Sequence, residues 1–585
     1  MKRWTYRFTL IISLAILFLK NMNGQAPNVV WGISLGEPFY DELNSITVDP
    51  FSGDVYTIGY FSHTIDFDPG PVAFNLTSNG NHDIFITKFN KDGLFVWAKN
   101  IGGELDDRGY QILFDPTGNG YICITGSFRG IVDFDPGEQN YIMDSSVSGG
   151  SFISKFDSDG NFIWAKAING TVRGIVIDPI DKDIYLTGIF NDTIDCDPSN
   201  DTYYLFSEGP FNVFAVKWTE SGEFVWAKQL SSSIYIAANA IAFDPIKKDV
   251  YLTGSFRSDV DFDPDPLSSF YLSAPGIRNY IFILKLNSVG SFAWAHAFGN
   301  GSGWTSSYSL VIDPGSESSI YTCGSFEGTV DFNPDSVETF NLFSPIIHPN
   351  SFILKLNGSG DFVWAKSGIA GSYLGEGFYL AIDTLGDGDL YTAGSFIGKI
   401  DFDPGPDSFM VISSNNNEVY YYDMFISKFD TEGNFEWAKT IRGPKYDYGR
   451  ALCLDTSGHV YIGGNFESPS ISFDNTTLFN TSLEGTPDIF ISKINTTIKN
   501  LDINPYVVNI YPVPASNEIV IKLEPGDIDN TEITVINSLG EVVYDNTIAH
   551  FDYEATIDIS QLIAGIYFIK LVIEGKAIVK KIIKV

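Results

Sequence analysis

Residues 55–99 read VYTIGYFSHTIDFDPGPVAFNLTSNGNHDIFITKFNKDGLFVWAK, and this stretch predicts the architecture of most of the chain. It holds three strand-like runs, with a DFDPG element after the first run and an NKDG turn before the last. Similar sequences recur around six later tyrosines, which are Tyr121, Tyr185, Tyr251, Tyr321, Tyr391 and Tyr461. A unit that occurs seven times determines the architecture before any single residue is given a role.

Each unit also has a strand-like run before this stretch, and ITVDP at residues 46–50 is the first example. Short turns join the runs, and the Gly that ends NKDG supplies the positive φ that a hairpin turn needs. The last run carries a tryptophan, with spacings of 62 to 73 residues between Trp97, Trp164, Trp226, Trp294, Trp364 and Trp437. Four strands at this period are typical of a propeller blade with one enlarged loop, and the tryptophans are expected in its core.

The seventh unit ends at residues 488–494 without a tryptophan-bearing run after it. A run of that type, VVWGI at residues 29–33, stands instead near the start of the chain. Pairing this first strand with the last sheet would close a ring and remove an open edge. The sequence therefore predicts an all-β, seven-bladed β-propeller over residues 25–497, with its N-terminal strand closing the last blade. The YxTGxF run, and the FxxK run followed by WA, resemble the propeller repeats of secreted bacterial proteins.

Composition and the first residues limit the partners and the location. The 72 acidic residues exceed the 36 basic residues and give a net charge of −36, which argues against a nucleic-acid partner. Lys2 and Arg3 precede an apolar run at 8–19 that is short for a membrane span, so residues 1–24 are predicted to be a signal peptide. No membrane span is expected in the mature protein, and four cysteines without a pairing pattern are expected as buried thiols: Cys123, Cys196, Cys323 and Cys453.

The DFDPG element places two carboxylates on one side of an extended segment and the Phe on the other. One interpretation is structural, with the acidic side chains forming turns with nearby backbone amides. The other is calcium binding, because Ca²⁺ takes six to eight oxygen ligands. The candidate ligands are Asp66, Asp68, Asp133, Asp135, Asp195, Asp197, Asp259, Asp261, Asp263, Asp265, Asp331, Asp401 and Asp403. The fourth unit is the best candidate, since four of these aspartates alternate there.

Variation among the units is concentrated in the connections that lead into the first run and in the long loop after the second. These connections share one face of a propeller, so a binding site is expected on that face or at the mouth of the central channel. Trp304, Tyr308 and Tyr373 are loop aromatics that would stack on a sugar or peptide, or anchor their own loops. No local catalytic motif stands out, so no catalytic residue is assigned.

After a predicted linker at 498–508, residues 509–585 hold seven strand-like runs, which predict a small Ig-like β-sandwich. This segment resembles the type A C-terminal sorting domain of type IX secretion cargo from Bacteroidetes. The residues that carry the resemblance are Tyr511, Pro512 and Pro514 in IYPVP, Gly540 in NSLGE, Gly565 and Tyr567 in GIY, and Lys580 and Lys581 in the tail. The resemblance implies the type IX machinery as a partner and passage through the periplasm to the medium or the outer-membrane surface.

The chain is accordingly expected to be a secreted or cell-surface binding or structural module, monomeric, with a glycan or protein ligand on the variable face. Two alternatives remain: an exported hydrolase or lyase acting on polysaccharide or peptide, and a calcium-stabilised adhesin. A cluster of perturbed carboxylates or a histidine on the variable face would favour the enzyme, and an aromatic groove without one would favour binding.

Overall fold

The computed structural model describes residues 27–496 and 507–584 with short gaps. The gaps are 116–119, 146–148, 315–317, 336, 346–348, 371–373, 385–387, 406–407, 417–418, 475, 482–484, 512–516, 525–527, 538–541, 552–553, 564 and 574–575. The predicted signal peptide and most of the predicted linker lie outside these residues. All the described elements are β-strands, which confirms the all-β class, and the described residues contain no helix able to cross a membrane. The chain divides into two compact units, Met1–Thr497 and Ile498–Val585.

The described residues of the first unit form seven four-stranded antiparallel sheets, named here sheets 1 to 7 in chain order of their first strands. Sheet 1 consists of β2 (Asp41–Val48), β3 (Val55–Phe61), β6 (Asp83–Phe89) and β7 (Phe95–Ile101), and sheet 2 of β8 (Arg108–Phe114), β9 (Tyr121–Phe128), β12 (Gly150–Asp157) and β13 (Phe162–Ile168). Sheet 3 consists of β14 (Thr171–Ile177), β15 (Ile184–Phe190), β18 (Phe211–Trp218) and β19 (Phe224–Ser232), and sheet 4 of β20 (Tyr235–Asp244), β21 (Asp249–Asp261), β23 (Tyr280–Leu286) and β24 (Phe292–Phe298). Sheet 5 consists of β25 (Thr305–Asp313), β26 (Ser319–Phe326), β29 (Asn350–Leu356) and β30 (Phe362–Ser367), and sheet 6 of β32 (Leu374–Ile382), β33 (Leu390–Phe396), β38 (Asp423–Phe429) and β39 (Phe435–Ile441). Sheet 7 consists of β40 (Asp447–Leu454), β41 (Val460–Phe466), β44 (Asp488–Asn495) and β1 (Asn28–Leu35).

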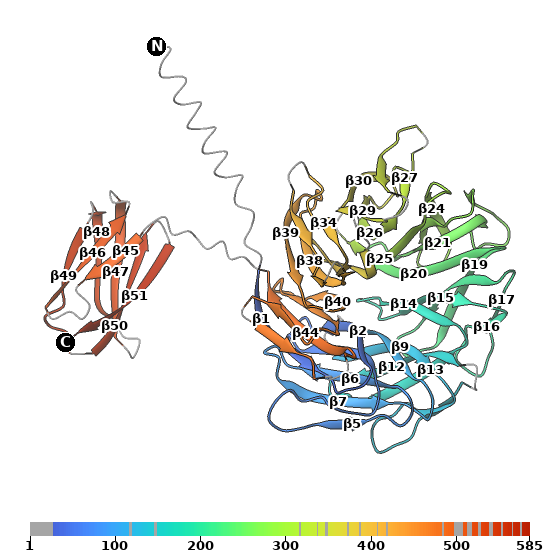
Figure 1. Ribbon diagram of the computed structural model, residues 1–585, viewed down its shortest axis with the longest axis horizontal. Helices are drawn as coiled ribbons and strands as arrows, with labels where there is room; N and C mark the ends of the chain where they lie inside the picture. The colour runs from blue at the N-terminus through green and yellow to red at the C-terminus, as the bar shows by residue number, and fades with distance from the viewer. Residues whose placement is uncertain are drawn as a thin grey trace, which may run out of the picture. The chain divides into compact units, whose positions relative to one another are not determined.

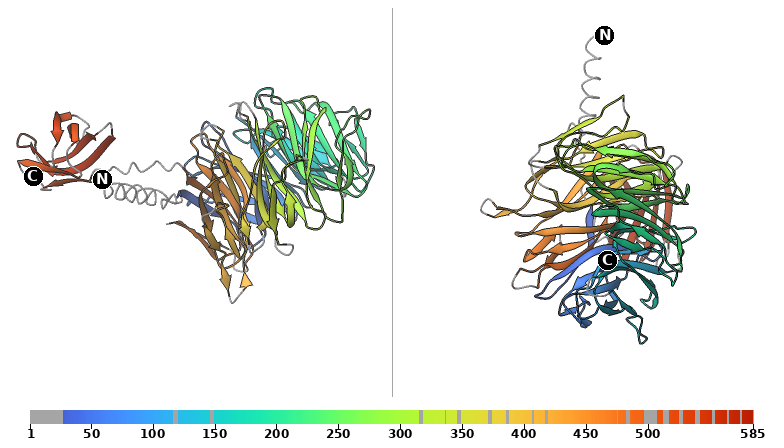
Figure 2. Two further views of the ribbon diagram at one scale, coloured as in Figure 1. Left: turned by 90° about the horizontal axis from the view of Figure 1, so that it is seen from above. Right: turned by 90° about the vertical axis from the view of Figure 1, so that its right-hand side faces the viewer.

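The sheets stand side by side around a ring (Figure 1, Figure 2). The first strand of each sheet packs against the first strand of the next, and β40 packs against β2, so the ring is closed. β1 is the outer strand of sheet 7, and its register on β44 runs from Asn28 opposite Asn495 to Leu35 opposite Ile489. Sheet 7 is therefore built from the first described strand and the last three large strands of the first unit.

The tryptophans pack between neighbouring sheets. Trp97 meets the buried Tyr56 of its own sheet edge-on, with ring centroids 6.1 Å apart, and donates its indole N–H to the carbonyl of Ser158 in sheet 2 at 3.3 Å. Gly160 in that turn has φ 79°, and a Cβ there would lie 3.1 Å from the Trp97 ring. The turn glycine thus supplies both the left-handed conformation and the space for the tryptophan.

The enlarged loop of each sheet contains a two-stranded ribbon between the second and third strands; in sheet 6 a third strand, β31 (Ile369–Ala370), pairs with the first strand of this ribbon. The ribbons are β4 (Thr64–Asp66) with β5 (Asn75–Thr77), β10 (Ile131–Asp133) with β11 (Ile142–Asp144), β16 (Thr193–Asp195) with β17 (Tyr204–Phe206), the end of β21 with β22 (Tyr271–Ala274), β27 (Gly328–Asp331) with β28 (Asn341–Ser344), β34 (Lys399–Asp401) with β35 (Met410–Ile412), and β42 (Ser470–Phe473) with β43 (Thr476–Phe479). In sheet 1, Phe74 of the ribbon packs on Phe95 of the outer strand, with ring centroids 5.0 Å apart. The ribbon thus folds back over the outer strand of its own sheet.

The second unit has seven described strands in two antiparallel sheets. One sheet has the order β45 (Val507–Tyr511), β46 (Glu518–Glu524), β49 (Glu554–Asp558). The other has the order β48 (Val542–Phe551), β47 (Ile528–Asn537), β50 (Gly565–Ile573), β51 (Lys576–Lys584). Both sheets contribute to one core, with Ile519 and Ile521 from the first and Val535 and Ile569 from the second. β45 begins at Val507, two residues inside the predicted linker.

Candidate functional site

The DFDPG carboxylates are turn formers. Asp66 Oδ1 accepts the backbone N–H of Asp68 at 3.1 Å and that of Phe74 at 2.7 Å, and Asp68 Oδ1 accepts the N–H of Gly70 at 2.8 Å. The first carboxylates of the next five sheets accept the N–H two residues later and that of the ribbon aromatic: Asp133, Asp195, Asp261, Asp331 and Asp401. The second positions accept the N–H two residues later: Asp135, Asp197, Asp263, Asn333 and Asp403. Each pair holds a ribbon turn closed.

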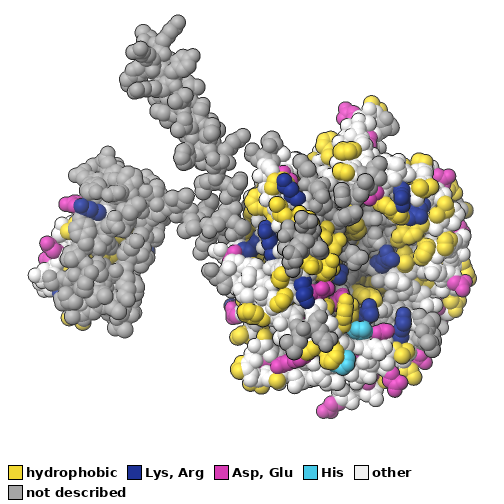
Figure 3. Space-filling model, viewed as in Figure 1, with side chains coloured by type: hydrophobic (Ala, Val, Ile, Leu, Met, Phe, Trp, Pro, Cys, Tyr) yellow, Lys and Arg dark blue, Asp and Glu magenta, His cyan; other side chains and the backbone are white. Residues whose placement is uncertain are grey.

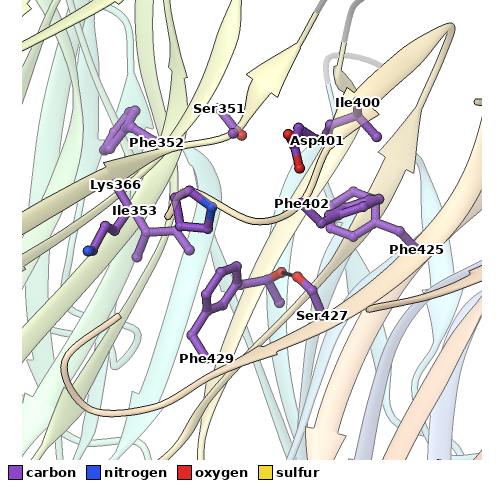
Figure 4. Close-up of a pocket in the computed structure, with 13 residues that line it drawn as sticks. Ser351, Phe352, Ile353, Lys366, Ile400, Asp401, Phe402, Phe425, Ser427 and Phe429 are labelled. Atoms are coloured by element: carbon purple, nitrogen blue, oxygen red, sulfur yellow. Dashed lines mark hydrogen bonds between the residues drawn. The ribbon is translucent and has the colours of Figure 1, made fainter. Parts of the chain in front are cut away.

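The DFDPG phenylalanine is buried in its own sheet, as Phe402 of sheet 6 illustrates. Its ring lies beside Phe425, with centroids 5.0 Å apart, while Asp401 points to the other side of the segment (Figure 4). The cavity between these residues and sheet 5 has a volume of about 30 Å³. Since about 10–15 Å³ of such volume is needed for one water, this cavity is too small for an organic ligand.

Calcium ligation by these aspartates stays a prediction. In sheet 4, Asp263 accepts the N–H of Asp265 at 3.0 Å and the hydroxyl of Ser268 at 2.6 Å, and Asp265 accepts the N–H of Leu267 at 3.0 Å. Asp259 is exposed on the ribbon strand. Across the described residues, no group of three or more His, Cys, Asp or Glu side chains is placed to hold a metal ion. The geometry favours the structural interpretation.

Replacing Asp133 by Ala is expected to lower the free energy of unfolding by about 1–3 kcal/mol, because the N–H groups of Asp135 and Tyr141 lose their acceptor. Asp133→Asn keeps an acceptor oxygen and is expected to cost well under half of that. Urea unfolding of both variants in calcium and in chelator measures the effect. A loss that occurs only in calcium would assign these carboxylates to a metal.

Sheet 7 departs from this pattern at the ring closure. Ser472 replaces the first aspartate, and Asp474 accepts the backbone N–H of Val29 at 3.0 Å. Lys439 of sheet 6 forms an ion pair with Asp474 and donates to the carbonyl of Pro27 at 2.9 Å. This ribbon therefore holds the start of β1.

A β-bulge recurs in the innermost strands. In every sheet except sheet 6, where the register differs, the first strand has one more residue than the described stretch of the second strand opposite it, at the same place in each repeat. These bulge residues are Asn44, Tyr110, Arg173, Asn239, Tyr308 and Arg450. A bulge leaves its extra residue outside the ladder and re-aims its side chain. Five of these six side chains, all except Tyr308, line one central cavity of about 460 Å³. Figure 3 shows Lys and Arg side chains around the hollowed centre of this face.

A second cavity of about 320 Å³ opens beside the first, at the junction of sheets 6, 7 and 1. Tyr40, Tyr422 and Tyr448 line it together with polar side chains, which are Glu42, Glu467, Asn465 and Arg450. Burial raises the pKa of Glu467, although Lys445 opposes the shift. Burial and the Glu467 charge raise the pKa of Tyr448 to about 12. This tyrosine pocket combines aromatic faces with carboxylate, amide and guanidinium groups, as sites for polyhydroxylated ligands do.

Trp304 lies in the connection before β25, but Tyr308 lies within β25 at its bulge, so the prediction of a loop position is wrong for Tyr308. Trp304 is 40% exposed, but the guanidinium groups of Arg257 and Arg278 lie 4.9 and 4.6 Å from its ring centroids. Its faces are therefore engaged in cation–π contacts, which agrees with loop anchoring. The hydroxyl of Tyr308 lies 2.7 Å from that of Ser325, and Tyr373 lies outside the described residues.

Perturbed carboxylates lie where adjacent sheets meet, but they are buried. Burial is the main cause that raises the pKa of Asp41 and of Asp447 to about 8, and of Asp107, Asp423 and Asp488 to about 6. In three pairs, the negative charge of an acid across the junction raises the pKa further. Asp488 acts in this way on Asp41, Asp83 on Asp107, and Asp423 on Asp447. All six side chains are fully buried and accept hydrogen bonds from their own connections. They therefore lie inside the junctions and not on the exposed surface of the variable face.

The remaining candidates have plainer surroundings. The four cysteines are free thiols; Cys123, Cys196 and Cys323 are buried, and Cys453 is partly buried. In the second unit, Tyr567 is buried and donates its hydroxyl to the carbonyl of Ile563 at 2.9 Å. Tyr511 ends β45, Gly565 begins β50, and Lys580 and Lys581 lie in β51. Pro512, Pro514 and Gly540 lie outside the described residues.

Two comparisons with known proteins bear on these features. An uncharacterized WD repeat-containing protein of Acanthamoeba polyphaga mimivirus is 23% identical in an alignment of 471 residues that takes in 68% of this chain. The chain covers 33% of that relative's length. Residues 509–585 match the secretion system C-terminal sorting domain. The chain therefore ends in the sorting domain that indicates export by the type IX secretion system.

Proposed function

We propose that this protein is a secreted or surface-attached seven-bladed β-propeller that binds an extracellular glycan in the tyrosine pocket. The closed ring of seven four-stranded sheets and the WD repeat-containing relative support the propeller architecture. The two-sheet second unit supports an Ig-like fold for the sorting domain. A signal peptide at residues 1–24 would direct the protein into the periplasm before the type IX system exports it. The sorting-domain match supports a location outside the cell or on its surface.

The observation that carries the ligand proposal is the composition of the tyrosine pocket. Three tyrosines from sheets 6, 7 and 1 meet there, with Glu42, Glu467 and Asn465 beside them. Tyr446 extends the aromatic surface, because its ring stacks on that of Tyr448 at 6.4 Å with an interplanar angle of 11°. Aromatic faces provide apolar contact for a sugar ring, and the carboxylates and amide pair with its hydroxyl groups.

Tyr448→Ala is expected to weaken glycan binding at least tenfold, because a central aromatic anchor commonly contributes about 2 kcal/mol or more. Tyr204→Ala is the matched control, since Tyr204 is exposed on the ribbon of sheet 3 and does not line the pocket. A glycan array identifies the ligand with the mature full-length protein, and calorimetry then measures both variants. Equal loss in both variants, or no glycan bound by the wild type, would overturn the proposal.

One feature favours an exported hydrolase or lyase as the second candidate. Glu42 and Glu467 line the same pocket, and the raised pKa of Glu467 suits a proton donor. Release of reducing ends or peptides from array-positive substrates tests this candidate. Cleavage by the wild type and its loss in Glu467→Gln with binding retained would assign an enzyme.

A further inference from the structure

Among the seven repeats, the residue at the bulge position varies in chemical type, whereas the residues that follow it keep a common pattern. The segments around it read ELNSITVDP, RGYQILFDP, TVRGIVIDP, AANAIAFDP, SSYSLVIDP, EGFYLAIDT and YGRALCLDT. The later residues keep an apolar pattern and a closing Asp, whereas the third residue is Asn, Tyr, Arg, Asn, Tyr, Phe or Arg. The bulge itself requires none of these side chains, because it is a backbone feature. These side chains are therefore available for a role in the central cavity, which five of them line.

The charge of this cavity is opposite to that of the protein. Arg173 and Arg450 line it, and its described lining residues include no Asp or Glu, although the chain carries a net charge of −36. Low-dielectric walls strengthen the field of like charges that share a cleft. The cavity is therefore a basic site within an acidic molecule.

Neighbouring groups orient the two guanidinium groups. Arg173 is exposed to the cavity and donates from Nη1 to Asn239 Oδ1 at 2.9 Å. Asn239 is fixed in turn, because its Nδ2 donates to the carbonyl of Ser307 at 3.0 Å. The Arg450 guanidinium lies 5.2 Å from the centroid of the Tyr448 ring. A guanidinium has five N–H donors, and its planar fork matches an oxyanion in a bidentate manner.

We propose that the central cavity binds an oxyanion group, carboxylate, sulfate or phosphate, of a small extracellular molecule, with Arg173 and Arg450 as its ligands. This inference goes beyond glycan binding in the tyrosine pocket, because it assigns an anionic ligand to a second cavity, which shares only Arg450 with that pocket. Tyr110 and Asn44 complete the wall, and the Nδ2 of Asn44 donates to the carbonyl of Gly109 at 2.8 Å. The preformed polar wall reduces the ordering cost of binding.

Calorimetry of the mature full-length protein at low salt tests the inference with four probes: trigalacturonate, a sulfated disaccharide, inorganic phosphate and neutral galactotriose. At least one anionic probe is expected to bind, to weaken as salt screens the charges, and to lose at least tenfold in affinity in Arg173→Gln. Arg278→Gln removes the same charge away from the cavity and is expected to bind like the wild type. The pattern among the three anions identifies the group that is recognised.

The inference is overturned if no anionic probe binds the wild type, if added salt leaves the affinity of every bound anion unchanged, or if Arg278→Gln loses as much affinity as Arg173→Gln. The wild-type titrations alone decide the first two outcomes, so the inference remains testable even if Arg173→Gln does not fold. Arrays run in parallel separate the two proposals. Glycan binding by the wild type on the arrays, while none of the three anionic probes binds it, would overturn the cavity site alone.

Discussion

Removal of residues 25–35 is expected to abolish the cooperative unfolding transition of the first unit. The truncation deletes β1, leaves the edge of β44 unpaired and exposes Tyr461, whose ring meets Trp31 with centroids 6.2 Å apart. It also removes the contacts of Val29 and Pro27 with the ribbon of sheet 7 and Lys439. Intrinsic fluorescence and calorimetry measure the loss, and a synthetic peptide of residues 27–36 is expected to restore the transition.

Two point variants sharpen this prediction. Trp31→Ala is expected to cost about 3 kcal/mol, because it empties a site between two sheets and deletes the indole bond to the carbonyl of Lys91. Val30→Ala is the control, since the side chain of Val30 is 53% exposed. If the truncated protein melts like the full-length protein, β1 does not contribute to the closed ring.

Raising the pH from 5.5 to 8.5 is expected to lower the melting temperature by several degrees. Burial raises the pKa of Asp41 and Asp447 to about 8, and that of three further junction acids to about 6. Raised values in the folded state mean that folding favours the protonated forms. Their stabilising contribution is complete below the unfolded pKa near 4 and is lost as the pH rises towards 8, by a few kcal/mol in total.

Calorimetry across this pH range measures the effect. Asp41→Asn combined with Asp447→Asn is expected to flatten the profile, because neither amide ionises. Asp201→Asn changes an exposed aspartate and is expected to leave the slope unchanged. A wild-type melting temperature that rises with pH would show that these acids are ionised in the folded protein.

Features with local chemistry could be predicted from the sequence. Hairpin turns with a terminal Gly, the alternation of large and small residues, and the repetition itself all act over a few residues, so the strands and the all-β class follow from the text. The sequence predicts only long loops where the ribbons lie, because three-residue strands are too short to show a period of two. The DFDPG pairs form the hydrogen bonds of the structural interpretation, since an aspartate accepts from amides two residues ahead, while calcium binding stays a prediction.

The tyrosine pocket could not be predicted, because its residues come from two widely separated parts of the first unit. Tyr40 and Tyr422 become neighbours only after the ring has closed, and no spacing in the sequence reports that distance. The bulge residues could have been found by comparing the repeats at the position before the conserved apolar run. The junction acids could be recognised from a pairing between repeats. Where an aspartate stands at or just before the first strand of a sheet, as Asp107 does, another aspartate begins the third strand of the preceding sheet, as Asp83 does.

The pairing of β1 with β44 has a consequence for how the chain folds. Asn28 lies opposite Asn495, so this contact closes a loop of almost the whole first unit, whereas sheets 1 to 6 each form from neighbouring residues. Loop-closure entropy grows with length, and contacts between distant residues slow folding. The six local sheets are therefore expected to assemble early as the chain is made, while the first strand waits for the last one. Pairing of β1 with β44 is therefore expected to be the slow step in folding of the first unit.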